Sequence, residues 1–572
     1  MAAYNPHVSI LQAIAQQGSG DFPTKPSHPA TLSTIPITLD VERLVHAAEP
    51  PITDKLYSGF LEHLGRCIYG GIVDNPNAPS HEDLLEKQDK GDSVSQGRLG
   101  WRKDVMRHLA KGGELEIPML RWPGGNFVSN YHWQDGIGPV SQRPKRIELA
   151  WLSDESNKFG TDEFIDYCRA TGCEPYICLN MGSGTFEEAL AWVEYCNGVG
   201  DTYWANLRRK NTGRNEPHAV KYWGLGNEMW GPWQVGNMLP FEYIRKAQQW
   251  AHALKLVDPS VKLVSCGETG ATDWDREVIQ TLISWADLHS IHFYTMIGHA
   301  KGSNVLGFDY EKNVFGPAAA EKHIEVCKSL IDMANISRVT QGMPAKDMKI
   351  CFDEWNVWDD VKAPGTGSNG LEQTYDYTDM LGFCAWLNVL VRKHKDIGIA
   401  CLAQSVNVIS PLMTRPNGIL KQTLYHPLAL FSKYMKNGHL LQVPSFPDVY
   451  EGPSFPVYIQ QGSYKPSYID TVAVLVKTPN GLSIRLSVLN RHPEADWKAV
   501  VKIHGFKLKH VEIHEIYSDD LAAVNTWDKP DTITPKVTKL NDTEWADSIE
   551  DQDNWTVKKH SWSFLIFDGY QS

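Results

Sequence analysis

The sequence has no long apolar run, and its few cysteines follow no metal-binding or disulfide pattern. There are 10 cysteines in 572 residues, and no CxxC pair has a matching partner, so a zinc site is not expected. Several of them, including Cys178, Cys266 and Cys351, lie inside apolar stretches, where a buried free thiol is the simplest interpretation. The longest apolar stretch, near residues 380–391, is too short to span a bilayer and fits a buried helix.

The first residues also lack a basic segment followed by an apolar core, so no secretory signal is evident. We therefore expect a cytoplasmic protein, with secretion by another route left open. An excess of 68 Asp and Glu over 55 Lys and Arg gives a formal net charge of −13. This charge argues against nucleic acid and membrane as partners and favours a neutral substrate. The 20 tryptophans and 22 tyrosines suit stacking on sugar rings, although most should lie in the core.

Most of the chain alternates short apolar segments with amphipathic helices. Residues 1–35 are expected to form an N-terminal arm, and residues 49–438 a catalytic domain. Within that domain eight apolar segments without polar alternation are predicted as strands, at residues 65–72, 117–125, 175–182, 219–228, 262–267, 287–294, 349–354 and 398–404. Such segments indicate parallel strands buried on both faces, and eight of them predict an α/β fold, a (β/α)8 TIM barrel. A doubly wound open sheet is the alternative, but no GxGxxG or phosphate loop follows any strand.

The last part of the chain has a different pattern. Residues 439–572 contain segments in which apolar and polar residues alternate, at 468–476, 482–489, 498–503, 511–517 and 562–567. This pattern predicts a C-terminal antiparallel β-sandwich, jelly-roll-like in form. Residues 36–48 alternate in the same way, with Ile37, Leu39 and Val41 on one side, and should contribute a strand to that sandwich.

Two of the predicted barrel strands end in a glutamate among tryptophans. Glu228 lies in KYWGLGNEMWGPW (221–233), and Glu354 lies in KICFDEWNVW (349–358). A pair of carboxylates at strand ends of a barrel suggests general acid and nucleophilic chemistry on a glycosidic bond. Other polar or aromatic residues follow strands in the same way: Arg121, Asn126, Asn227, His292, Tyr294, Trp358, Gln404 and Asn407. Each alone could be an ion-pair partner, a core histidine or a loop amide; together they predict one site.

Five segments make a resemblance specific: EHLGRCIYGGI (62–72), LRWPGGNFVSNYHWQDGIGP (120–139), GLGNEMWGPWQ (224–234), IHFY (291–294) and DEWNVW (353–358). From about Pro36 to its end, the chain resembles the α-L-arabinofuranosidases of glycoside hydrolase family 51, which are retaining barrel glycosidases. The resemblance implies an exo-acting hydrolase that releases terminal non-reducing α-L-arabinofuranosyl residues from arabinan, arabinoxylan or their oligosaccharides. It implies no metal and no organic cofactor, and a homo-oligomer, because family members are often hexamers.

The resemblance also implies a role for each matching residue. Glu228 would be the general acid/base, protonated near neutral pH, and Glu354 the nucleophile that forms a covalent glycosyl intermediate. Asn227 would bind the sugar 2-hydroxyl, and His292 and Tyr294 would orient the two glutamates. The remaining matches surround the furanose ring or form aromatic walls: Glu62, Arg121, Asn126, Trp151, Trp358 and Gln404.

Two features depart from the family pattern or vary within it, and both concern the leaving group. Trp230 stands where many family members carry an acidic residue, and residues 360–375 form a loop rich in glycine. The nearest alternative function is an endo-β-1,4-glucanase or β-xylosidase activity on the same scaffold, alone or as a second activity. An alternative of another class is a carbohydrate-binding protein without catalysis, against which both glutamates argue.

Overall fold

The computed structural model describes most of the chain. The described residues are 34–45, 50–74, 81–82, 99–296, 309–363, 370–452, 465–550 and 555–572. Nearly all of the predicted N-terminal arm and the centre of the 360–375 loop lie outside them. All ten cysteines are free and buried. None of the helices in the described ranges is long and apolar enough to cross a bilayer.

Eight parallel strands close into a barrel in the order β10-β11-β12-β13-β14-β2-β6-β9, which confirms the predicted fold class. Their bounds are β2 (Ser58–Phe60), β6 (Met119–Trp122), β9 (Glu174–Cys178), β10 (Tyr222–Leu225), β11 (Lys262–Ser265), β12 (Leu288–Thr295), β13 (Lys349–Val357) and β14 (Ile397–Leu402). The register sets Arg121 beside Tyr176 and His292 beside Glu354. Apolar side chains from these strands fill the barrel interior, among them Met119, Val264 and Ile399.

The predicted first strand at residues 65–72 is wrong. The first barrel strand is β2, which joins β14 and β6 through Gly59, and residues 65–72 form turns. Gly65 and Gly70 have φ angles of 51° and 86°, in the left-handed region that strands do not use. Glu62 therefore follows the first strand instead of preceding it, which puts it at the carboxyl-terminal rim of the barrel.

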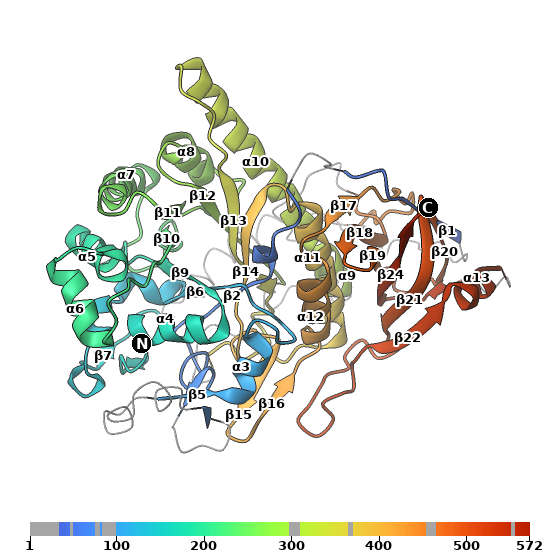
Figure 1. Ribbon diagram of the computed structural model, residues 1–572, viewed down its shortest axis with the longest axis horizontal. Coiled ribbons are helices and arrows are strands. Elements are labelled where there is room, and N and C mark those ends of the chain that lie inside the picture. Colours follow the sequence, from blue (N-terminus) through green and yellow to red (C-terminus); the bar gives the residue numbers. More distant parts are fainter. Residues whose placement is uncertain are drawn as a thin grey trace, which may run out of the picture.

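Helices surround the barrel (Figure 1). They are α3 (Lys103–Leu109), α4 (Thr161–Thr171), α5 (Phe186–Asn197), α6 (Tyr203–Thr212), α7 (Pro240–Val257), α8 (Asp273–Leu282), α9 (Asp309–Phe315), α10 (Pro317–Thr340), α11 (Tyr377–Arg392) and α12 (Tyr425–Tyr434). Capping boxes begin several of them, for example with Thr185 and Glu188 at α5, Thr272 and Asp275 at α8, and Asp376 and Asp379 at α11. Helix α11 contains the apolar stretch at 380–391 and is buried along almost its whole length, as predicted.

The C-terminal part forms two facing sheets. One has the order β17-β18-β19-β24-β21-β22, with β17 (His439–Leu441), β18 (Ile469–Thr478), β19 (Gly481–Asn490), β21 (Phe506–Ile516), β22 (Lys536–Asn541) and β24 (Ser561–Gln571). The other has the order β1-β20-β23, with β1 (Thr34–Asp40), β20 (Trp497–His504) and β23 (Thr556–Val557). Helix α13 (Asp542–Glu550) lies beside them. Apolar side chains of both sheets, including Ile37, Leu39 and Val488, share one core.

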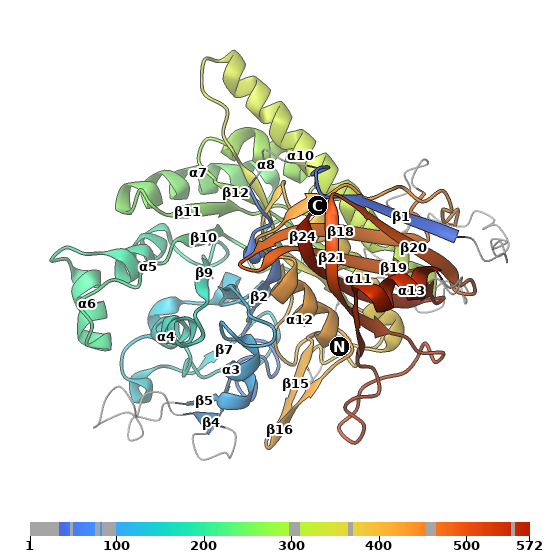
Figure 2. The same ribbon diagram turned by 45° about the vertical axis from the view of Figure 1, so that its right-hand side comes forward.

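The sandwich is not antiparallel throughout, because β1 pairs with β20 in parallel. A strand that arrives from the far end of the chain is free of the hairpin geometry that makes neighbouring strands antiparallel. In both views the blue β1 lies among the red strands (Figures 1 and 2). The sandwich rests on α11, where the Tyr377 hydroxyl donates to the carbonyls of Ile516 and His560. We propose residues 438 and 439 as the boundary between the two domains.

Candidate active site

Glu228 lies just beyond the carboxyl end of β10. The backbone leaves the strand through Gly226, with a φ of 82°, and Glu228 itself has a φ of 44°. A non-glycine residue in this region is strained, and such strain is typical of functional sites. The His292 ring nitrogen Nδ1 lies 3.0 Å from Glu228 Oε1, and the Trp233 indole N–H donates to Oε2 at 2.8 Å. Both oxygens of the carboxyl group are therefore held in place.

Glu354 lies on β13 and is held from two other strands. Arg121 Nη1 donates to Glu354 Oε1 at 2.7 Å, and the Tyr294 hydroxyl donates to Oε2 at 2.7 Å. Gly125 passes close by, because a Cβ atom there would lie 2.9 Å from Oε1. The glycine thus lets the backbone approach the carboxylate, and the contacts leave its orientation little freedom.

The two glutamates are close together. One carboxylate oxygen of each and one ring nitrogen of His292 all lie within 4.8 Å of one another. Carboxyl groups lie about 5–5.5 Å apart in retaining glycosidases and about 6.5–9.5 Å apart in inverting ones, which must admit a water molecule between acid and base. The observed separation fits the retaining class.

A buried aspartate next to Glu354 organises the site from below. Asp353 contacts Arg121 Nε at 3.3 Å and accepts a hydrogen bond from the Tyr176 hydroxyl at 2.8 Å. It also accepts from the Ser290 hydroxyl and lies 3.3 Å from His292 Nε2. Burial alone raises the pKa of Asp353, but the positive charges of Arg121 and His292 hold it well below its usual range. Asp353 is a functional candidate that a search for polar residues at the ends of strands does not find. The predicted strand at residues 349–354 ends in Glu354, and Asp353 precedes that end.

His292 is a buried cation. Burial lowers the pKa of His292, but the charges of Glu354 and Asp353 and the hydrogen bond to Glu228 outweigh it and raise the pKa to about 10. A protonated imidazole has no lone pair to offer a metal. Glu228, His292 and Glu354 could by position alone surround a cation, but a protonated His292 fits a hydrogen-bonded ion cluster instead.

Glu62 and Gln404 form the opposite wall of the site. Glu62 Oε1 accepts from the backbone N–H of Phe127 at 3.0 Å and from the Trp151 indole at 3.1 Å. Glu62 Oε2 accepts from the Gln404 amide at 3.0 Å. Burial raises the pKa of Glu62 to about 8, and the Glu354 charge adds to this effect, against the lowering by the Phe127 N–H. Glu62 and Gln404 are thus locked to each other and to Trp151.

The remaining predicted residues complete the rim. Asn227 Oδ1 accepts from Arg121 Nη2 at 2.6 Å, and the Asn227 amide lies 3.4 Å from the side-chain oxygen of Asn126. The Trp358 ring meets the Tyr294 ring edge to face, with centroids 5.5 Å apart. These residues share contacts with those that hold Glu354, so the structure brings the predicted set together.

Asn407 is the exception. Its side-chain amide donates to the carbonyl of Arg66 and to the Thr414 hydroxyl, both at 2.8 Å. These contacts tie two loops together, and its φ of 60° marks a turn. Asn407 is therefore a buried loop amide, the alternative that its sequence position left open.

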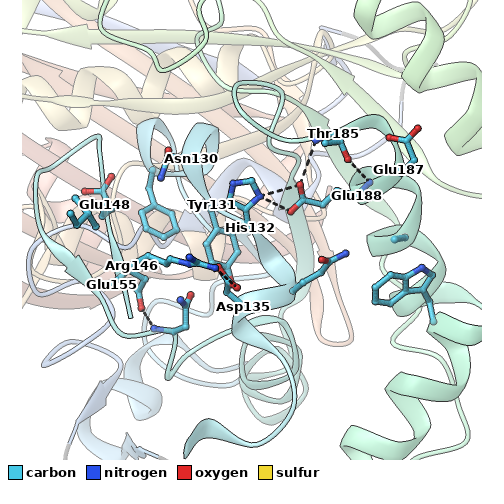
Figure 3. Close-up of a pocket in the computed structure, with 16 residues that line it drawn as sticks. Asn130, Tyr131, His132, Asp135, Arg146, Glu148, Glu155, Thr185, Glu187 and Glu188 are labelled. Atoms are coloured by element: carbon cyan, nitrogen blue, oxygen red, sulfur yellow. Dashed lines mark hydrogen bonds and ion pairs between the residues drawn. The ribbon is translucent and has the colours of Figure 1, made fainter. Parts of the chain in front are cut away.

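A cavity of about 670 Å³ lies beside this site (Figure 3). Of the described residues that line it, none is Glu228 or Glu354. Ion pairs cross its walls, His132–Glu188 at 3.1 Å and Arg146–Asp135 at 2.8 Å. Phe127 links the two regions, because its side chain lines the cavity and its N–H donates to Glu62. The candidate active site is thus defined by its converging carboxyl groups and not by this cavity.

A closed (β/α)8 barrel with paired carboxylates at the carboxyl ends of its strands defines a glycoside hydrolase. Family models described as "Alpha-L-arabinofuranosidase 1 domain" and "Alpha-L-arabinofuranosidase C-terminal domain" match residues 112–304 and 353–561. The chain is 46% identical to α-L-arabinofuranosidase C of Emericella nidulans over 90% of this chain and 94% of that protein. The chain belongs to the α-L-arabinofuranosidases of glycoside hydrolase family 51, as its motifs predicted.

Two further similarities bear on activity and fold. The chain is 34% identical to a protein of Halalkalibacterium halodurans named intracellular exo-α-(1→5)-L-arabinofuranosidase, over 86% of this chain and 92% of that one. It superposes on a family 51 α-L-arabinofuranosidase of Thermotoga petrophila with a TM-score of 0.77 and 35% identity, over 94% of this chain and 100% of the other. The similarity therefore extends through both the barrel and the sandwich.

Proposed function

We propose that the protein is a retaining exo-glycosidase that releases terminal α-L-arabinofuranosyl residues from arabinan, arabinoxylan or their oligosaccharides. The observation that carries this proposal is the short separation between Glu228 and Glu354, within 4.8 Å for one oxygen of each. The exo-acting name of the Halalkalibacterium halodurans relative supports release of terminal residues. The site needs no metal or organic cofactor for this chemistry, because both steps use side-chain carboxyl groups.

In the first step Glu354 attacks the anomeric carbon of the arabinofuranosyl residue. The glycosidic C–O bond breaks, and Glu228 gives its proton to the departing oxygen, which leaves as a hydroxyl group. Arg121 and Tyr294 hold Glu354 at 2.7 Å each and so fix the direction of attack. The product of this step is an ester between Glu354 and the sugar.

In the second step Glu228, now a carboxylate, takes a proton from water as that water attacks the anomeric carbon. The bond to Glu354 breaks, and arabinose leaves with its original configuration. His292 and Trp233 contact the two oxygens of Glu228, so the same group can serve as acid and then as base without moving. The residues that bind and wall the furanose ring are Glu62, Arg121, Asn126, Trp151, Asn227, Trp358 and Gln404.

Two variants test these roles. We expect Glu354→Ala to abolish turnover of every substrate. Glu228→Ala should retain hydrolysis of 4-nitrophenyl arabinofuranoside relative to oligosaccharides, because a nitrophenolate leaves without a proton. Azide should restore turnover by attacking the anomeric carbon of the ester with Glu354, which releases the Glu354 carboxylate and forms an α-linked glycosyl azide with retention of configuration. A Glu228→Ala variant that is equally inactive on both substrates and not rescued by azide would contradict the assignment.

Substrate class is tested with a panel of α-L-arabinofuranoside, β-D-xyloside, β-D-glucoside and cello-oligosaccharides. Strong preference for the arabinofuranoside is the expected result, and comparable turnover of cello-oligosaccharides would support the glucanase alternative. We further propose a cytoplasmic homo-oligomer, a hexamer by family resemblance, that binds neither nucleic acid nor membrane. Light scattering of the purified protein measures its assembly.

A further inference from the structure

Besides Glu62, Glu228 and Glu354, the rim of the barrel carries another acidic residue, Glu268, to which the proposed function assigns no role. Glu268 follows β11, between Glu228 after β10 and His292 on β12 in the order of strands around the barrel. Among the residues proposed to enclose the sugar ring, Gln404 follows β14, Glu62 follows β2 and Asn126 follows β6, whereas Asn227 follows β10 beside Glu228. In this order β11 stands across the barrel from β2, so Glu268 lies opposite Glu62, on the side of the rim that we assign to the leaving group.

The backbone at Glu268 is fixed from both sides. Its N–H donates to Asp275 Oδ1 at 2.7 Å, and its carbonyl accepts from the N–H of His292 at 2.7 Å. Asp275 is itself held by His289 at 3.0 Å, and all of its surface is buried. Gly267 must be glycine, since a Cβ atom there would lie 1.9 Å from the carbonyl oxygen of Ser290. A side chain on such a support is well suited to recognise a ligand in a fixed orientation.

The carboxyl group of Glu268 suits sugar hydroxyls. Burial raises its pKa to about 7, and the charges of Asp275 and Glu228 add to this, against a hydrogen bond from Thr272 that lowers it. Near neutral pH both protonation states are therefore populated, so the group can accept or donate a hydrogen bond. A hydroxyl group needs partners of both kinds.

An aromatic surface stands beside the two carboxyl groups. The Trp230 indole donates to the carbonyl of Gly267 at 3.0 Å, next to Glu268, and the Trp233 indole donates to Glu228 at 2.8 Å. The two indole rings meet edge to face with centroids 5.0 Å apart. An apolar ring face next to a polar group is the usual composition of a small-molecule site. Trp230, the departure from the family pattern, thus belongs to the leaving-group side.

We propose that Glu268 binds hydroxyl groups of the sugar residue that leaves, and so determines the preference for sugar over aryl leaving groups. This inference rests on the proposed arabinofuranosidase function. It makes Glu268 a specificity residue for the leaving group, separate from the pair that breaks the bond.

The test compares Glu268→Gln with the wild-type protein on two substrates that share the arabinofuranosyl group. One is α-1,5-linked arabinobiose, with a sugar leaving group, and the other is 4-nitrophenyl α-L-arabinofuranoside. We expect kcat/KM for arabinobiose to fall about tenfold or more, and that for the aryl substrate to change less than about threefold. Glu277→Gln on α8, whose side chain is 43% exposed, is the matched control and should change neither.

Activity on the aryl substrate also reports whether the variant is folded. Equal losses on both substrates would overturn the inference, because Glu268 would then act through the catalytic pair. Unchanged kinetics on both would overturn it as well. A wild-type protein that hydrolyses neither arabinofuranoside would refute the proposed function itself, which is a separate result.

Discussion

Replacing Asp353 with asparagine tests the electrostatic design of the site. The change keeps the shape of the side chain but removes a negative charge that faces Arg121 at 3.3 Å and His292 at 3.3 Å. The hydroxyl groups of Tyr176 and Ser290 can rotate to suit an amide, whereas the Arg121 guanidinium can only donate. The variant therefore leaves buried positive charge without its partner.

The size of the effect follows from burial. Arg121 and Asp353 are each 1% exposed, and removing one partner of a buried ion pair costs about 3–5 kcal/mol. We expect a clear fall in the thermal midpoint of Asp353→Asn. If the missing charge also raises the free energy of the transition state by about 3 kcal/mol relative to the bound substrate, kcat falls about 100-fold. Differential scanning fluorimetry and hydrolysis of 4-nitrophenyl arabinofuranoside measure the two effects.

Asp379→Asn is the matched control, because it removes a buried carboxylate at the start of α11 that is held by Lys362 and Asn313 and not by the residues of the site. Asp379 lies 3.0 Å from Lys362 Nζ and accepts from the Asn313 amide at 2.7 Å. We expect this variant to lose thermal stability but to keep kcat within about threefold. Equal kcat values for Asp353→Asn and Asp379→Asn, at equal folded fractions, would refute the argument that Asp353 acts on the site.

Two further predictions follow from single contacts. Tyr294→Phe removes the 2.7 Å hydrogen bond to Glu354. A hydrogen bond to a charged group contributes about 1.5–3 kcal/mol, so we expect kcat/KM to fall about 10- to 100-fold. A change of less than about threefold in steady-state assays would contradict this role of Tyr294. The pKa of Glu62 is raised from 4.5 to about 8, so its contribution to stability is complete below pH 4.5 and is lost as the pH rises through 8. Glu62→Gln should therefore weaken the decline of the thermal midpoint between these pH values, and identical pH curves for both proteins would count against it.

The sequence predicts the barrel well because parallel strands buried on both faces leave a distinct signal. Strand β13, for example, is buried at every residue after Lys349, and its sequence is an apolar run interrupted by Asp353 and Glu354 of the site and by Asn356. The first strand fails for the opposite reason. Its three residues, Ser58–Phe60, are too short to stand out, and the apolar but glycine-rich run at 65–72 imitates a strand.

The polar residues at strand ends could be predicted because a parallel barrel brings the carboxyl ends of its strands to one rim. Asp353 and Tyr176 could not be found in this way, since they face the barrel interior below that rim. A charged residue inside an apolar strand is the one signal that points to Asp353. Asn407 shows the converse error, because a residue at a strand end can be used entirely for loop contacts.

The buried charges of the site explain how one arrangement can serve both proposed steps. Before reaction, with Glu228 protonated, the cations Arg121 and His292 face two carboxylates, Asp353 and Glu354. After the first step Glu354 is an ester without charge, and Glu228 has become the second carboxylate. The balance of two cations and two anions is thus unchanged, and the negative charge moves less than 5 Å, between groups that both contact His292. Because burying an unbalanced charge is costly, this conserved balance lowers the cost of forming the intermediate.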